Sequence, residues 1–136
     1  MKGWHEVMGL EEKRWLAQER DEVMPEAQRA LREIVGFDLA YVVDWDSFAN
    51  DLEALQNLQH QGFGRINDAF RDLCRDAVGK AAVKEALDAV HLQNLSDPAA
   101  KSVSVSDRTV VIRAAWGAGD GYFVDTQIGK AISEAL

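Results

Sequence analysis

The spacing of apolar and polar residues changes several times along the chain, and each change predicts a new element. Residues 10–35 place apolar side chains at helical spacing. Pro25 suits the first turn of a second helical segment, and Gly36 suits the end of that segment. Residues 37–45, FDLAYVVDW, then alternate apolar and other positions with a period of two. We therefore expect two helices, or one kinked helix, followed by a strand.

A helical pattern returns after this strand and continues to about residue 90. Asp46 is a residue type that caps helices, so we expect a helix from about Ser47. The glycines within the segment 60–64 favour a break in that helix. Apolar residues at helical spacing predict further helices at 65–77 and 80–90.

The last third of the chain returns to extended patterns. Residues 91–95 and 122–124 are short strand candidates, and 102–106, SVSVS, alternate strictly. The pair Asp107–Arg108 looks like a tight connection to the apolar run 109–116, which indicates a hairpin. A final helix is expected after Asp125 or Thr126.

This order of elements predicts an α+β fold in a single domain that spans residues 1–136. We divide it into an N-terminal helical segment (1–36), a strand with helices (37–90), and strands with a C-terminal helix (91–136). We expect a mostly antiparallel sheet of about four strands, with helices packed on one face. The single cysteine, Cys74, occupies an apolar helical position and is expected in the core.

The chain has 23 acidic and 15 basic residues, a net charge of −8. No Lys or Arg interrupts residues 38–53, where we expect an acidic surface made by Asp38, Asp44, Asp46, Asp51 and Glu53. Affinity for nucleic acid comes from Lys and Arg, so we do not expect a nucleic-acid partner. No apolar run approaches the roughly 20 residues that span a bilayer, and the charged start is unlike a secretory signal. We therefore expect a cytoplasmic protein without a membrane partner.

The glycine-rich segment 116–121, WGAGDG, raises the question of a phosphate-binding loop. Such loops lead directly into a helix, whereas residues 122–124 favour extended structure, and no Walker lysine follows. We predict a mobile turn whose glycines supply positive φ, with contact to a partner's backbone as the alternative. Its residues are Gly117, Gly119, Asp120 and Gly121.

Asp44 and Asp46 form an Asp-x-Asp at the end of the predicted strand. Two carboxylates there could hold Mg²⁺ for phosphoester hydrolysis, but Asp46 is better explained as a helix cap. The three histidines lack metal-binding spacing, and no nucleophile elbow occurs. We assign no catalytic residue, metal or cofactor, and an enzyme is not the favoured interpretation.

Trp4 and Trp15 lie in the charged N-terminal region, where an exposed apolar patch would indicate an interface. Together with the acidic segment, this favours a protein that binds a basic protein partner, for example as an inhibitor or immunity protein. Two alternatives remain open. One is the metal-dependent phosphoester hydrolase, and the other is a homodimer or structural subunit that associates through the N-terminal helix.

Overall fold

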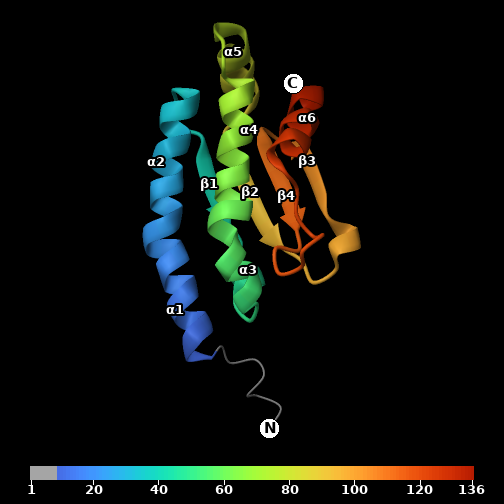
Figure 1. Ribbon diagram of the computed structural model, residues 1–136. Coiled ribbons are helices and arrows are strands. Elements are labelled where there is room, and N and C mark those ends of the chain that lie inside the picture. Colours follow the sequence, from blue (N-terminus) through green and yellow to red (C-terminus); the bar gives the residue numbers. More distant parts are fainter. Residues whose placement is uncertain (1–8) are drawn as a thin grey trace.

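The computed structural model describes residues 9–136, and Trp4 lies outside them. Two helical columns stand side by side (Figure 1). In the first, α1 (Leu10–Gln18) continues through a π-helical turn (Glu19–Val23) into α2 (Met24–Val35). Gly36 ends this column with φ +83°, as expected of a glycine stop.

The second column corrects one sequence-based expectation. Here α3 (Leu52–Asn57), a π-helical turn (Leu58–Gly64) and α4 (Arg65–Leu73) follow one another without interruption. The predicted break at 60–64 is therefore wrong. At Gly62, an added Cβ would lie 2.7 Å from a Leu58 side-chain carbon, so the glycine permits close packing rather than a turn. α5 (Ala77–Ala86) then crosses one end of the molecule.

The sheet contains four strands in the order β1-β2-β4-β3. They are β1 (Ala40–Val43), β2 (Ala89–Asn94), β3 (Ser102–Ser106) and β4 (Thr109–Ala114). β1 and β4 both run parallel to β2, and only the β3–β4 pair is antiparallel. The expected strand number is right, but a mostly antiparallel sheet is wrong. The reason is that β4 pairs with the distant β2 as well as with its hairpin partner.

The predicted hairpin is confirmed. Asp107 and Arg108 have φ of 51° and 62°, and they connect the paired residues Ser106 and Thr109. Positive φ at both central residues is the signature of a type I′ turn, which matches the twist of the flanking strands. The candidate strand at 122–124 does not form, because these residues belong to the loop before α6 (Asp125–Ala135).

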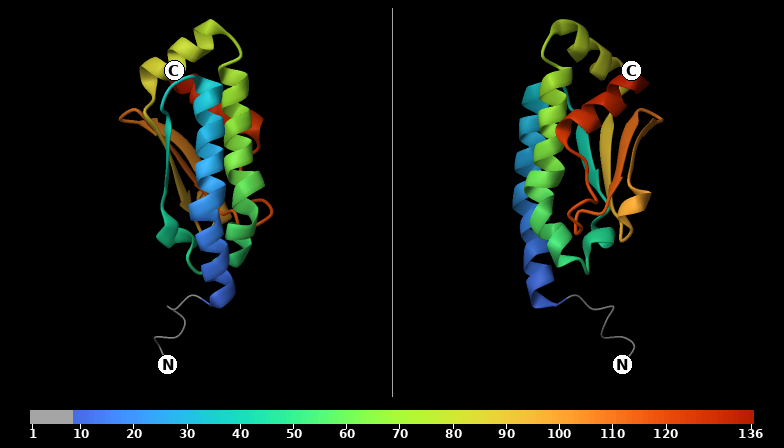
Figure 2. Two further views of the ribbon diagram at one scale, coloured as in Figure 1. Left: turned by 90° about the vertical axis from the view of Figure 1, so that its left-hand side faces the viewer. Right: turned by 45° about the vertical axis from the view of Figure 1, so that its right-hand side comes forward.

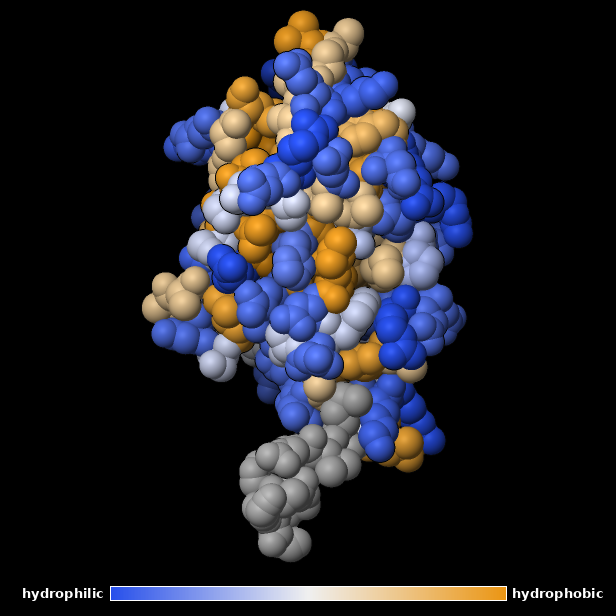
Figure 3. Space-filling model, turned by 180° about the vertical axis from the view of Figure 1, so that it is seen from behind, coloured by the Kyte–Doolittle hydropathy of each residue, from blue (hydrophilic) through white to orange (hydrophobic). Residues whose placement is uncertain are grey.

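Both helical columns and α6 cover the same face of the sheet, as predicted (Figure 2). The core lies between these layers and includes the buried residues Leu31, Phe48, Phe70, Cys74, Leu92, Ile112, Trp116 and Ile132. Within residues 9–136, no helix covers the opposite face. That open face shows separate apolar patches among polar side chains (Figure 3), and Val42 on β1 is 49% exposed there.

The outer edge of β1 is closed by one side chain from α2. The Gln28 amide donates to the Leu39 carbonyl at 2.6 Å, and the Tyr41 N–H donates to Gln28 Oε1 at 2.7 Å. Gln28 thus occupies the place of a further strand, and it is buried there. The Tyr41 hydroxyl donates to Asn67 Oδ1 on α4, which attaches β1 to the second column as well.

Replacing Gln28 with Ala should lower the free energy of unfolding by about 2 kcal/mol or more, because it leaves two buried backbone groups without partners. The exposed Gln18 on α1 provides a matched control, and Gln18→Ala should change stability by less than about 0.5 kcal/mol. Urea denaturation of both variants measures the difference. Equal effects would show that the Gln28 bonds do not stabilise the β1 edge.

Candidate functional site

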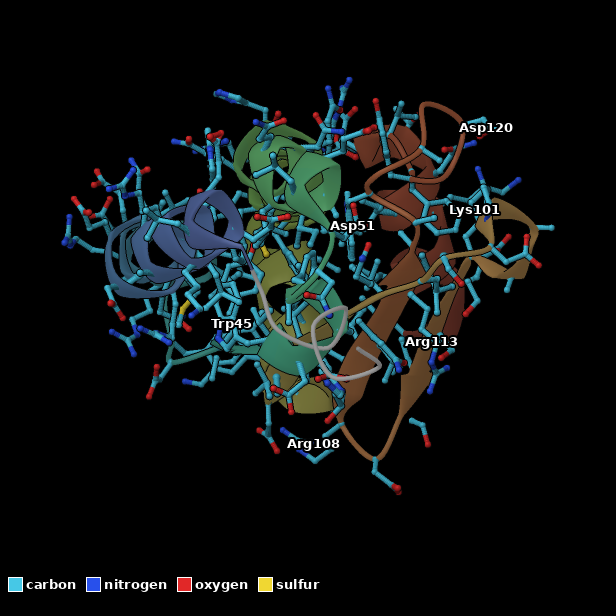
Figure 4. The ribbon with its side chains drawn as sticks, turned by 90° about the horizontal axis from the view of Figure 1, so that it is seen from below. Trp45, Asp51, Lys101, Arg108, Arg113 and Asp120 are labelled. Atoms are coloured by element: carbon cyan, nitrogen blue, oxygen red, sulfur yellow. The ribbon has the colours of Figure 1, made fainter. Side chains whose placement is uncertain are left out.

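The carboxyl ends of the parallel strands β1, β2 and β4 lie at one end of the sheet. In open α/β sheets, ligands bind outside these strand ends. The acidic segment follows β1, and the glycine-rich loop follows β4, so the fold brings the two sequence-predicted candidates together. Figure 4 looks at this end of the molecule, with Asp51 near its middle and Asp120 in the outer loop.

The buried Asn94, at the end of β2, connects these segments. Its Nδ2 donates to Asp51 Oδ2 at 2.9 Å and to the Ser47 carbonyl at 3.2 Å. Its Oδ1 accepts the Trp116 N–H at 3.2 Å, and its own N–H donates to Ser47 Oγ at 2.9 Å. The sequence reasoning missed Asn94 because nothing local marks it within a strand candidate.

The glycine-rich segment forms turns, as predicted, and hydrogen bonds connect it to the rest of the molecule at several points. Asn57 Nδ2 donates to the Trp116 carbonyl at 2.7 Å, and Trp116 Nε1 donates to the Gln61 carbonyl at 3.2 Å. The Trp116 ring stacks on Phe48 with centroids 5.6 Å apart. On the outer side, Lys101 Nζ donates to the Asp120 carbonyl at 3.0 Å.

The loop glycines are not there for positive φ, because Gly36 is the only glycine with positive φ among residues 9–136. Gly117 packs on Asp51, where an added Cβ would lie 2.6 Å from Oδ1. Gly121 packs on the backbone of Ala115, where a Cβ would lie 2.2 Å from the carbonyl oxygen. Only Gly119 faces open space. Two of the three glycines are therefore required by close approach.

The five predicted acidic residues have different environments. Asp51 is partly buried: it caps α3 by accepting the Ala54 N–H, and it also accepts a hydrogen bond from Asn94 Nδ2. The predicted cap at Asp46 is therefore wrong, because a 3₁₀ turn (Trp45–Phe48) precedes the helix and delays its start to Leu52. Asp38 pairs with Arg32 at 2.7 Å. Asp44, Asp46 and Glu53 form no salt bridge within residues 9–136.

The predicted exposed tryptophan patch does not form with Trp15. Its side chain is partly buried and packs against the hydrophobic core. Trp45 likewise packs inward, with its ring 6.1 Å from Phe48. The remaining member, Trp4, lies outside the described part of the chain.

Glu19 is the buried ionisable group that the sequence did not reveal. It is 1% exposed in the π-helical turn of the first column, and its Oε1 has no hydrogen-bond partner among the described residues. Burial raises the pKa of this carboxyl to about 7. The spacing in the sequence was an indication of this burial, because Glu19 follows the apolar Leu16 by three residues and therefore lies on the same helix face.

The strand-end region contains the carboxylates of Asp44, Asp46 and Asp51. Nowhere in residues 9–136 do three His, Cys, Asp or Glu side chains gather closely enough to hold a metal ion. In the same part of the chain, no helix is both long and apolar enough to cross a membrane.

No protein-family model, curated protein or solved structure matches this sequence or fold.

The three loop glycines should respond differently to Ala substitution. Gly121→Ala should destabilise the protein by roughly 2 kcal/mol, because backbone must move to admit the methyl group. Gly117→Ala should cost about 1 kcal/mol by displacing Asp51 from its cap. Gly119→Ala is the matched control and should be nearly neutral. Thermal unfolding measures all three, and an equal loss at Gly119 would contradict the close-approach account.

Glu19→Gln should make stability less dependent on pH. Burial raises the pKa of Glu19 from 4.5 to about 7, so the stability that its neutral form contributes is fully present below pH 4.5. Stability contributed by this group is lost as pH rises from about 4.5 to 7, by roughly 3 kcal/mol. The variant should therefore gain stability over the native protein at pH 8 but not at pH 4. Unfolding experiments between pH 4 and pH 8 measure this difference. If the stability difference between the variant and the native protein were the same at every pH, Glu19 would not be neutral when buried.

Proposed function

We propose that this protein acts by binding a basic protein through its acidic end, which we define as Asp44, Asp46 and Glu53. An inhibitor or immunity protein that blocks a basic enzyme is the concrete form that the small size and negative charge favour. The observation that supports the proposal is a run of acids that no Lys or Arg interrupts in the sequence, within which these three carboxylates form no salt bridge in residues 9–136.

Six aspartates elsewhere pair with arginines within 4.0 Å, and they are Asp21, Asp38, Asp68, Asp72, Asp88 and Asp125. The three carboxylates of the acidic end have no such partner within residues 9–136, which is also true of other acids such as Asp107. What distinguishes the acidic end is its sequence, because residues 33–64 contain six acids and no Lys or Arg. Unpaired charges of one sign produce a field that attracts and orients an oppositely charged partner.

Hydrogen bonds hold the backbone segments that carry these acids. Ser47 Oγ donates to the Asp44 carbonyl at 2.6 Å and accepts from the Asn94 N–H, which fixes the turn that contains Asp46. The capped N-terminus of α3 places Glu53 in its first turn. A preformed surface loses less conformational entropy on binding than a flexible one, which favours affinity.

The alternative of a metal-dependent hydrolase rests on the Asp44–Asp46 pair alone, since no third His, Cys, Asp or Glu joins these two within residues 9–136. The binding surface is favoured because the charge pattern of residues 33–64 supports it independently. Polyanionic nucleic acid would be repelled by the same unpaired carboxylates, so a cationic protein is the partner class that fits.

Asp44→Asn, Asp46→Asn and Glu53→Gln together should slow association with the natural partner about tenfold at low salt and weaken its salt dependence. The triple variant Asp21→Asn, Asp68→Asn and Asp72→Asn changes the net charge equally but at paired sites, and it should bind with nearly native kinetics. Parallel affinity capture from the native cell with all three baits identifies proteins lost only with the first variant. Surface plasmon resonance then measures their association rates.

The proposal requires the two triple variants to differ. A natural partner that binds the acidic-end variant with unchanged rate and salt dependence would contradict it. Circular dichroism of both variants confirms that the fold is intact, because none of the six residues is fully buried.

A further inference from the structure

The two edge strands of the sheet differ in whether their outward backbone groups form hydrogen bonds. Gln28 closes the β1 edge, as described above. β3 forms the other border, and no strand lies beyond it within residues 9–136, although the 3₁₀ turn Pro98–Ala100 lies beside its start (Figure 1). Within Ser102–Ser106 there is no charged residue, proline or bulge, and these are the usual devices that prevent an edge strand from pairing.

The hairpin register determines which backbone groups of β3 are free. A two-residue turn makes Ser106 and Thr109 a hydrogen-bonded pair, and the pattern then alternates along the ladder. The backbone groups of the three serines therefore face β4, whereas those of Val103 and Val105 face outward. No backbone or side-chain group in residues 9–136 bonds to these outward groups.

We propose that β3 pairs antiparallel with β3 of a second copy of this chain, so that two four-stranded sheets become one continuous sheet. A twofold axis at Ser104 sets Val103 opposite the partner's Val105. This register aligns the outward groups of both strands and pairs the whole strand, whereas axes at Val103 or Val105 leave one end unpaired.

Charge complementarity supports a second copy as the occupant. With the axis at Ser104, Lys101 of each chain lies opposite Asp107 of the other. Asp107 is exposed and forms no salt bridge within the described chain. Lys101 uses one of its three N–H groups on the Asp120 carbonyl, so donors remain for the partner's carboxylate. At each end of the paired strands, a lysine of one copy therefore faces an aspartate of the other.

The side chains between these ends also match. On the helix-covered face, the half-buried Val103 and Val105 lie opposite each other across the seam, which extends the apolar layer. On the open face, small serines meet serines without steric conflict. α6 packs against β3, so a copy of α6 flanks each side of the seam. This self-pairing is separate from the acidic end and does not depend on the proposed function.

Ser104 allows a direct test because it is exposed and would meet its own copy at the axis. Sedimentation velocity of the full chain over a concentration series should show a monomer–dimer equilibrium for the native protein. Ser104→Glu should raise the dimer dissociation constant about fivefold or more, because like charges then lie opposite each other. Ser104→Lys should do the same, and an equimolar mixture of the two variants should restore the dimer.

Gln93→Glu is the matched control, since it adds the same charge on the open face of β2, away from the edge, and it should dimerise like the native protein. Hydrogen exchange gives a second measurement: the Val103 and Val105 amides should gain protection as the native protein is concentrated. A native chain that stays monomeric at all concentrations overturns the proposal. A dimer unaffected by Ser104→Glu also overturns it and indicates another contact, such as the N-terminal helix.

Discussion

The hydrogen bonds of the Asn94 amide are the constraint on which the strand-end region depends. A buried carboxamide has two N–H donors and one carbonyl acceptor, and here Ser47, Asp51 and Trp116 satisfy them. Leaving one of these groups unpaired would cost about 1–3 kcal/mol, so the three segments stabilise one another. The need for glycine at 117 follows directly, because a side chain there would collide with the carboxylate that Asn94 holds. Hydrogen bonds to Asn94 therefore connect the segment Ser47–Asp51 with the start of the glycine-rich loop at Trp116.

The mixed sheet explains why surfaces with different properties arise in so small a protein. Parallel pairing of β1, β2 and β4 gathers three strand ends, with the acidic turn and the loop, at one end of the molecule. Helices cover only one face (Figure 2), and α2 reaches the β1 edge through Gln28, whereas no group in residues 9–136 bonds to the outward backbone groups of Val103 and Val105. Parallel sheets are usually covered on both faces, which makes the open face here unusual.

Local signals in the sequence predicted those features that depend on neighbouring residues. The hairpin at Asp107–Arg108 and the burial of Cys74 were predicted correctly, and so was the placement of the helices on one face. The direction of pairing was not, because residues about twenty positions apart align β2 with β4 and no short pattern encodes that choice. The cap was misassigned because Asp46 and Asp51 are chemically equivalent, and only the 3₁₀ turn between them decides which one begins the helix. The role of Gly121 could not be inferred either, since it depends on contact with Ala115.

The two proposed contacts differ in their physical basis, and ionic strength separates them. Attraction between the acidic end and a basic partner acts through solvent, so it weakens as added salt shortens the Debye length below about 10 Å. Pairing of β3 rests mainly on backbone hydrogen bonds and valine contacts, which salt does not screen. Each copy also has a net charge of −8, so screening reduces the repulsion between two copies. We therefore expect added salt to weaken the proposed contact of the acidic end much more than the proposed pairing of β3, in which only the Lys101–Asp107 contacts are screened.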